Sequence, residues 1–162
     1  MLRLLAVLAA AVPLLGQAAP KAEILEYGYY EFQGESQRME HPLTASGHVT
    51  QGRAKLVEQT QRIPIKKGRL FGFRFHIGNI REGVNIIPLE LVVKHPPMKK
   101  PDGTVSTGYR YPMDLKLDKG EVTDNSGYRL SETFEMVEGD WSFEFLYMNE
   151  PLLKQEFTTY KP

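Results

Sequence analysis

Four histidines are the residues of this sequence best suited to chemistry, and their spacing argues against a metal site. No two of His41, His48, His76 and His95 stand four residues apart, which is the spacing of a helical zinc pair. The sequence contains no cysteine, and no acidic cluster lies between His41 and His48. We therefore predict no metal ligands and no cofactor, and we interpret His41 and His48 as solvated loop residues.

Sequence motifs of hydrolases and nucleotide-binding proteins do not occur. There is no Gly-x-Ser-x-Gly, His-Glu-x-x-His or glycine-rich phosphate-binding motif. Paired carboxylates for glycoside hydrolysis act through proximity in space, so sequence alone leaves them open. The acidic residues considered for such a pair are Glu132, Glu135, Glu138 and Glu144. We predict no catalytic residue and interpret these four as solvated positions on strands.

The residues from 95 to 111 form the predicted binding surface. The stretch from His95 to Gly108 contains three prolines, which restrict its backbone and lower the entropy cost of one fixed shape. Basic side chains there supply donors for an acidic or polar partner, and tyrosines supply stiff apolar area. The alternative is that the prolines only stiffen a crossing between two sheets. The predicted binding residues are His95, Lys99, Lys100, Tyr109, Arg110 and Tyr111.

Alternating apolar residues predict the strands that must position this surface. The clearest period of two runs through Leu70–Ile77, Ile86–Val93 and Asp140–Tyr147. Pro88 removes a ladder donor, so its strand begins near that residue or lies at an edge. Four weaker strands are predicted at 24–32, 55–63, 128–136 and 152–160.

Turn signals and the scarcity of helical periodicity predict the fold class. The sequence from Met148 to Pro151 is typical of a hairpin turn, and two long turn-rich stretches, 34–52 and 95–108, are predicted as loops. No segment sustains an apolar period of 3.6 residues. We predict an all-β, immunoglobulin-like β-sandwich of about seven to eight antiparallel strands, with a small β-barrel as the alternative.

Residues 1–18 have the features of a signal peptide. Arg3 supplies a positive charge, Leu4 to Leu15 form an apolar run, and small residues precede the cleavage site after Ala18. The run is shorter than the roughly 20 residues that a membrane-spanning helix needs. We expect a periplasmic or secreted protein with no membrane span after cleavage, and one β-sandwich domain over residues 19–162.

Composition narrows the range of partners. The chain has 20 basic and 20 acidic residues, so it lacks the basic surface that nucleic acid requires. Removing 18 residues from 162 leaves 144, which can bury enough surface to fold without disulfides. We therefore expect no nucleic-acid partner.

Several segments resemble a known family. They are Val93–Gly103 (VKHPPMKKPDG), Tyr111-Pro112, Phe134–Trp141 (FEMVEGDW) and the closing Phe157. In these segments the sequence resembles the bacterial family named domain of unknown function 3859. The resemblance implies an exported immunoglobulin-like sandwich with no assigned activity, and it supplies no catalytic residue.

Together these observations predict an exported, non-enzymatic binding or assembly module of the bacterial cell envelope. Its partner would be a protein or an envelope polymer. One alternative is an envelope carbohydrate hydrolase, which would place two carboxylates in a cleft. The other is a secretion or pilus-like subunit that exchanges strands, which would leave its N-terminal strand poorly paired.

The signal peptide makes the first testable prediction. We expect the protein isolated from its native host to begin at Ala19, because signal peptidase removes the segment after small residues. N-terminal sequencing of the purified protein measures this directly. A chain that still begins at Met1 would contradict export by this route.

Overall fold

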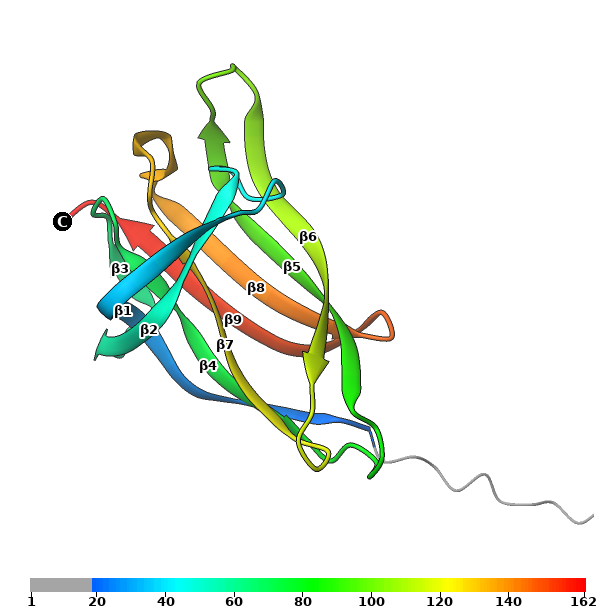
Figure 1. Cartoon of the computed structure of the whole chain (residues 1–162). Helices are drawn as coiled ribbons and strands as arrows, with labels where there is room; N and C mark the ends of the chain where they lie inside the picture. The colour runs from blue at the N-terminus through cyan, green and yellow to red at the C-terminus, as the bar shows by residue number, and fades with distance from the viewer. Residues whose placement is uncertain (1–18) are drawn as a thin grey trace, which may run out of the picture.

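The computed structural model describes residues 19–162, so the predicted signal peptide lies outside the described residues. Nine strands form two sheets, drawn in Figure 1. The strands are β1 (Lys21–Glu40), β2 (His48–Glu58), β3 (Arg62–Pro64), β4 (Leu70–Gly78), β5 (Ile86–Lys99), β6 (Val105–Lys116), β7 (Val122–Arg129), β8 (Gly139–Tyr147) and β9 (Glu150–Tyr160), with one short 3-10 helix, η1 (Thr133–Glu135).

The two sheets form the predicted immunoglobulin-like β-sandwich. The first sheet has strand order β2-β1-β4-β7, and the second has order β3-β9-β8-β5-β6. Two details differ from the prediction of seven to eight antiparallel strands. There are nine strands within the described residues, and the three-residue strand β3 pairs with β9 in parallel.

The strongest sequence patterns give the correct strands. β4, β5 and β8 cover the three runs with an apolar period of two, and the predicted turn after β8 is confirmed. Met148 and Asn149 both have positive φ angles, of 53° and 66°, as a two-residue type I′ hairpin requires. β5 pairs with β8 from Glu90 to Lys94, and Pro88 lies outside this span. The N–H group that proline lacks is therefore not needed for pairing with β8.

The two stretches predicted as long loops are mostly strand, and that prediction is wrong. Each contains a bulge that accommodates the turn-forming residues. On β1, residues 33–35 lie opposite the single residue Arg53, and Gly34 takes a φ of 80°. On β5, residues 95–97 lie opposite Thr107, so Pro96 and Pro97 sit where the ladder is already interrupted. Glycine and proline therefore mark bulges here rather than loops.

Two weaker strand predictions also need correction. The predicted strand 55–63 is divided between the end of β2 and β3, and the predicted strand 128–136 ends at Arg129. The chain then enters η1, whose buried Glu135 carboxylate accepts hydrogen bonds from the Tyr128 hydroxyl at 2.5 Å and the Ser131 amide at 2.7 Å. Local hydrogen bonding to a buried carboxylate thus replaces the ladder that periodicity predicted.

Aromatic side chains fill the space between the sheets. Phe71, Phe73 and Phe75 of β4 face Trp141, Phe143 and Phe145 of β8, and all six are essentially inaccessible. Ring centroids of Phe71 and Trp141 lie 5.0 Å apart in an edge-to-face arrangement. The Trp141 indole also donates to Thr159 Oγ1 at 3.3 Å. These residues therefore form one buried cluster, as the apolar period of two along β4 and β8 indicates.

A row of glycines crosses the first sheet. Gly28, Gly72 and Gly127 occupy neighbouring register positions on β1, β4 and β7. A Cβ atom on Gly72 would lie 2.2 Å from the Ser126 carbonyl oxygen, and one on Gly127 would lie 2.4 Å from that of Phe71. Only glycine permits so close an approach of neighbouring backbones, and the missing side chains let the sheet coil.

The strand β1 changes partner along its length. Residues 21–30 pair with β4, and residues from Tyr29 onward pair with β2. The outer part of the β1–β2 hairpin, residues 31–54, therefore leaves the first sheet as an arm. Figure 1 shows this arm crossing toward β5 and β6, where the His41 ring lies 4.7 Å from that of Tyr111.

Replacing Trp141 with Ala should destabilise the fold by about 3–5 kcal/mol, because a large aromatic cavity would form in the core. Urea denaturation monitored by circular dichroism measures the free energy of unfolding. The exposed Val105→Ala variant is the control and should change it by less than about 0.5 kcal/mol. A loss under about 1 kcal/mol for Trp141→Ala would contradict the described core.

Candidate functional site

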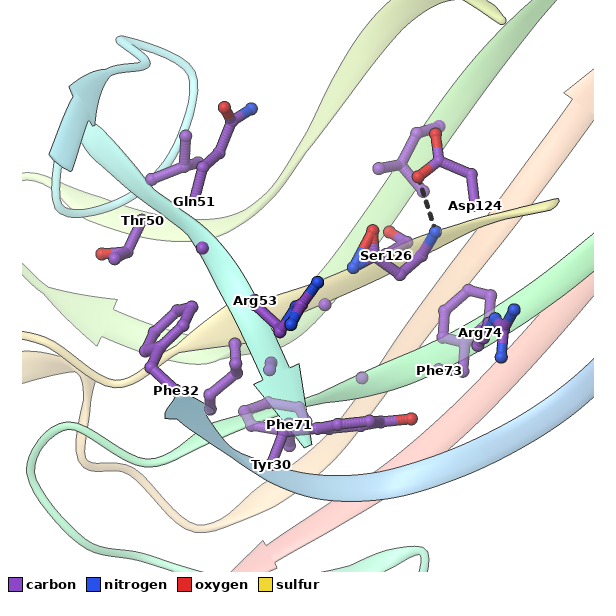
Figure 2. A pocket seen from close by; sticks show the side chains of 18 of the residues that line it. Tyr30, Phe32, Thr50, Gln51, Arg53, Phe71, Phe73, Arg74, Asp124 and Ser126 are labelled. Atoms are coloured by element: carbon purple, nitrogen blue, oxygen red, sulfur yellow. Dashed lines mark hydrogen bonds between the residues drawn. The ribbon is translucent and has the colours of Figure 1, made fainter. Parts of the chain in front are cut away.

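A cleft of about 920 Å³ opens on the side of the sandwich, beneath the arm. Its walls come from β2, β7 and β6, and its floor includes Phe71 and Phe73 of β4. Figure 2 shows Arg53 of β2, Ser126 of β7 and Phe73 of β4 around the opening. At one end Arg129 Nη1 donates to Thr50 Oγ1 at 3.2 Å, which ties β7 to β2. A cleft of this size can hold several residues of a peptide or a few sugar rings.

Polar and aromatic side chains share the lining. Arg53 and Arg74 contribute guanidinium groups, and neither forms an ion pair within the described residues. Glu26 and Asp124 contribute carboxylates, and Asp124 Oδ1 accepts a hydrogen bond from the Asn125 amide at 2.8 Å. An apolar floor with a few placed polar groups is typical of ligand sites in proteins.

Two buried polar atoms in this lining lack partners. Tyr30 Oη and His41 Nδ1 are inaccessible and form no hydrogen bond of normal length and angle within residues 19–162. Burial raises the pKa of Tyr30, and so do the charge of the nearby Glu26 carboxylate and its weak interaction with the hydroxyl, so Tyr30 keeps its proton and remains a donor. An unpaired buried polar group costs about 1–3 kcal/mol, so such groups need an explanation.

The two predicted tyrosines line the cleft, but Arg110 between them is not part of the lining. Tyr109 and Tyr111 line the cleft from β6 and hold the His41 ring edge-on, with centroids 6.0 and 4.7 Å away. Burial raises the pKa of Tyr109. Arg110 instead makes a bidentate ion pair with Glu90, at 2.9 and 2.5 Å, and its hydrogen bonds lower the pKa of that carboxyl.

The remaining predicted residues lie apart from the cleft lining. His95 is 5% exposed and packs on Trp141 with centroids 5.1 Å apart. Its Nδ1 donates to the Pro96 carbonyl at 2.8 Å, while Nε2 accepts from the Ser106 hydroxyl at 3.2 Å. Lys99 and Lys100 lie where the β5–β6 hairpin turns. The structure thus brings together Tyr109 and Tyr111 of the predicted set.

The histidines that we interpreted as solvated are not. His48 is 8% exposed, and His41 is half-buried against the two tyrosines. That interpretation was wrong because the segment between them is a hairpin loop that packs on β6 instead of projecting into solvent. No group of three or more metal-ligating side chains gathers anywhere in residues 19–162.

The two alternative functions, a carbohydrate hydrolase and a strand-exchanging subunit, each predict a structural feature that can be compared with the fold. The four glutamates considered for hydrolysis are absent from the cleft lining. Their interpretation as solvated strand positions was wrong for Glu135, which is fully buried in η1 and accepts hydrogen bonds there, and of the four Glu144 alone lies on a strand. The N-terminal strand β1 pairs with both β2 and β4, whereas a strand-exchanging subunit would leave it poorly paired. In the described part of the chain, no helix has the length and apolarity needed to cross a bilayer.

Sequence reasoning missed most of the cleft. Tyr30, Arg53, Asp124 and Asn125 carry no motif, and each follows the composition of an ordinary strand or turn. One signal was available for β7, because its small polar residues and Gly127 make a poor core strand and are better suited to an edge.

Comparison with known proteins agrees with the architecture. The family described as Domain of unknown function (DUF3859) matches residues 18–159. An immunoglobulin-like protein from Pseudomonas aeruginosa, known from its crystal structure, has a similar fold with a TM-score of 0.59 and 25% sequence identity. The similarity covers 89% of this chain and 98% of that one.

More remote likenesses involve parts of larger proteins. The DNA glycosylase AlkC of Pseudomonas fluorescens gives a TM-score of 0.43 at 13% identity, over 61% of this chain and 27% of its own. A β-glucosidase of Listeria innocua gives the same score and identity over 69% and 17%. Both scores are too low to support an inference. No curated protein sequence matches the chain significantly.

The burial of His95 predicts a pH dependence of stability. Burial lowers the pKa of His95, although the Pro96 carbonyl and the Glu135 carboxylate oppose the shift. As the pH falls through the usual histidine value of about 6.5, the unfolded chain binds a proton that the folded chain does not, so stability should decrease.

Urea denaturation at pH 7.5 and 5.5 measures this effect. The wild type should lose more stability on acidification than His95→Gln, while His76→Gln, on the outer face of β4, should behave like the wild type. Equal losses in the wild type and His95→Gln would show that His95 does not titrate differently in the fold.

Proposed function

The chain belongs to the family described as Domain of unknown function (DUF3859), and we propose that this member is an exported, non-enzymatic binding module of the bacterial cell envelope whose ligand occupies the cleft beneath the arm. The family supplies the architecture and no activity. The residues that line the cleft and the N-terminal sequence support the binding role and the export.

The unpaired polar atoms in the cleft carry the proposal. Tyr30 Oη and His41 Nδ1 are buried beside the same opening, and neither forms a hydrogen bond of normal length and angle among the described residues. A fold that maintains such groups loses stability at each, unless a ligand completes their hydrogen bonds. A ligand that enters the cleft and displaces the side chains covering these atoms would supply partners to both, which supports a binding role.

The cleft is also preorganised. Tyr109 and Tyr111 hold the His41 ring, and Arg129 donates a hydrogen bond to Thr50 at one end of the cleft. These contacts fix the arm over the opening before any ligand binds, so less entropy is lost on binding.

Export is supported by the first 18 residues and by composition. A basic residue, an apolar run and small residues before Ala19 are the features of a secreted precursor. The envelope is the compartment where a periplasmic or secreted module meets its partner, a protein or an envelope polymer.

Site-specific photocrosslinking in the native host tests the binding role. A photoreactive amino acid in place of Gln51, an exposed residue of the cleft, should yield a discrete adduct with envelope material. The matched control is Gln59, an exposed residue of the same type outside the cleft lining. Adding Tyr30→Phe to the Gln51 probe should reduce the adduct several-fold, because one hydrogen-bond donor is removed. Equal adducts from both positions, or none from Gln51, would refute the proposal.

A further inference from the structure

The free edges of three strands border the cleft, and we propose that the free edge of β7 accepts an extended polypeptide segment of a partner protein as an added strand. This inference rests on the proposed function, since it names the ligand of the same cleft. β2 and β7 are the two outer strands of the first sheet, and β6 is an outer strand of the second. All three contribute to the lining.

The hydrogen-bonding pattern shows which β7 groups face the opening. Leu130, just beyond the end of β7, donates its amide to the Arg69 carbonyl beside β4. The Asn125 amide instead donates to the Asp124 side chain. Because an antiparallel strand bonds to its neighbour at alternate residues, the N–H and C=O groups of Thr123, Asn125 and Gly127 point away from β4. These are the groups that an added strand would use.

The edge of β6 is unsuited to the same role. Leu117 donates its amide to Asn85, so alternation turns the backbone of Pro112 toward the free edge. Proline has no N–H, and it interrupts this edge in the middle of the cleft. The large side chains of Tyr109 and Tyr111 flank that position and are engaged by His41.

The edge of β2 is also interrupted. β2 carries an extra residue, Val57, where its pairing with β1 shifts register between Tyr29 and Tyr30. A second shift follows at the β1 bulge, residues 33–35, which lies opposite Arg53. The first bulge breaks the regular spacing of donors and acceptors on β2, and the second increases the local twist of the β1–β2 pair, so β2 offers an incoming strand a less regular edge.

The edge of β7 has none of these defects. Val122–Arg129 pairs with β4 in unbroken register and contains no proline. Three outward residues offer about six backbone hydrogen bonds, which is the basis of affinity in strand addition. A strand placed roughly 4.8 Å beyond β7 would turn alternate side chains toward Tyr109, Tyr111 and Met113, which line the cleft from β6 and are partly exposed. The expected partner segment is therefore extended, with apolar residues at alternate positions.

The Asp124 side chain covers part of the free edge of β7. Its carboxylate occupies the Asn125 amide, which is the central donor of the free edge. A charged residue on an edge strand discourages pairing with a second copy of the chain. The bond is made by a side chain, so rotation of Asp124 releases the donor without any change in the sheet.

A pair of substitutions at one position isolates the backbone contribution. Asn125→Pro removes the outward N–H and leaves the ladder to β4 intact, whereas Asn125→Ala removes only the side chain. Asp124→Ala provides a second test that does not depend on tolerance of proline, because it frees the same donor. Melting temperature and the amide NMR spectrum report whether each variant folds.

The probes are linear peptides of 12 residues selected from a phage-displayed random library against the wild type, and chitotetraose as a representative envelope glycan. We expect selected peptides to slow amide exchange at Thr123, Asn125 and Gly127. Asn125→Ala should bind them as the wild type does, Asn125→Pro should bind at least tenfold more weakly, and Asp124→Ala should bind several-fold more tightly.

The outcomes separate this inference from the proposed function. Peptides that leave the β7 amides unprotected, or that bind folded Asn125→Pro as tightly as the wild type, would overturn strand addition. Cleft shifts with chitotetraose alone would overturn it as well, while leaving a binding role for the cleft in place. If Asn125→Pro does not fold, unchanged peptide affinity in Asp124→Ala would overturn the inference.

Discussion

Close backbone contact at the glycine row is the constraint on which the rest of the structure depends. At Gly72 and Gly127, neighbouring carbonyl oxygens occupy the space that a Cβ would take. Any side chain there would push β4 away from β7, and the first sheet would have to flatten. The arm could then no longer reach β6, and His41 would lose its contacts with Tyr109 and Tyr111. The cleft is thus a consequence of how tightly three strands approach one another.

The coiling of the first sheet also leaves free strand edges around the cleft, and a different feature of the sequence protects each edge from pairing. Free edges invite aggregation, and three of them lie around one opening. β6 is interrupted by Pro112 and β2 by its bulge at Val57, and both features are permanent parts of the backbone. On β7 the protection comes from the Asp124 side chain, which can rotate away. Of the three edges, that of β7 is therefore the one that can be made available for pairing without a change in the backbone.

The sequence predicts the core better than it predicts the ends of strands or the cleft. Runs such as Leu70–Ile77 alternate because one face is buried, and this local pattern is visible in a single chain. Gly34 and Pro96 were misleading, because the residues that break strands also fill bulges within them. Whether such a residue ends a strand depends on its partner strand, which a local pattern does not identify.

The cleft depends still more on long-range contacts. Tyr30 and Asn125 are almost a hundred positions apart in sequence, and only the path of the arm brings them to one opening. Tyr109 and Tyr111 were predicted from sequence as binding residues that adjoin a loop, and they lie on β6. There they hold the His41 ring and thereby the arm. Rigid aromatic contacts on β6 thus keep the opening in shape, and they also hold the unpaired Nδ1 of His41 in a fixed position. The backbone groups that can accept a strand lie across the cleft, on β7. The cleft therefore combines one side that fixes its geometry with another that offers a row of backbone donors and acceptors.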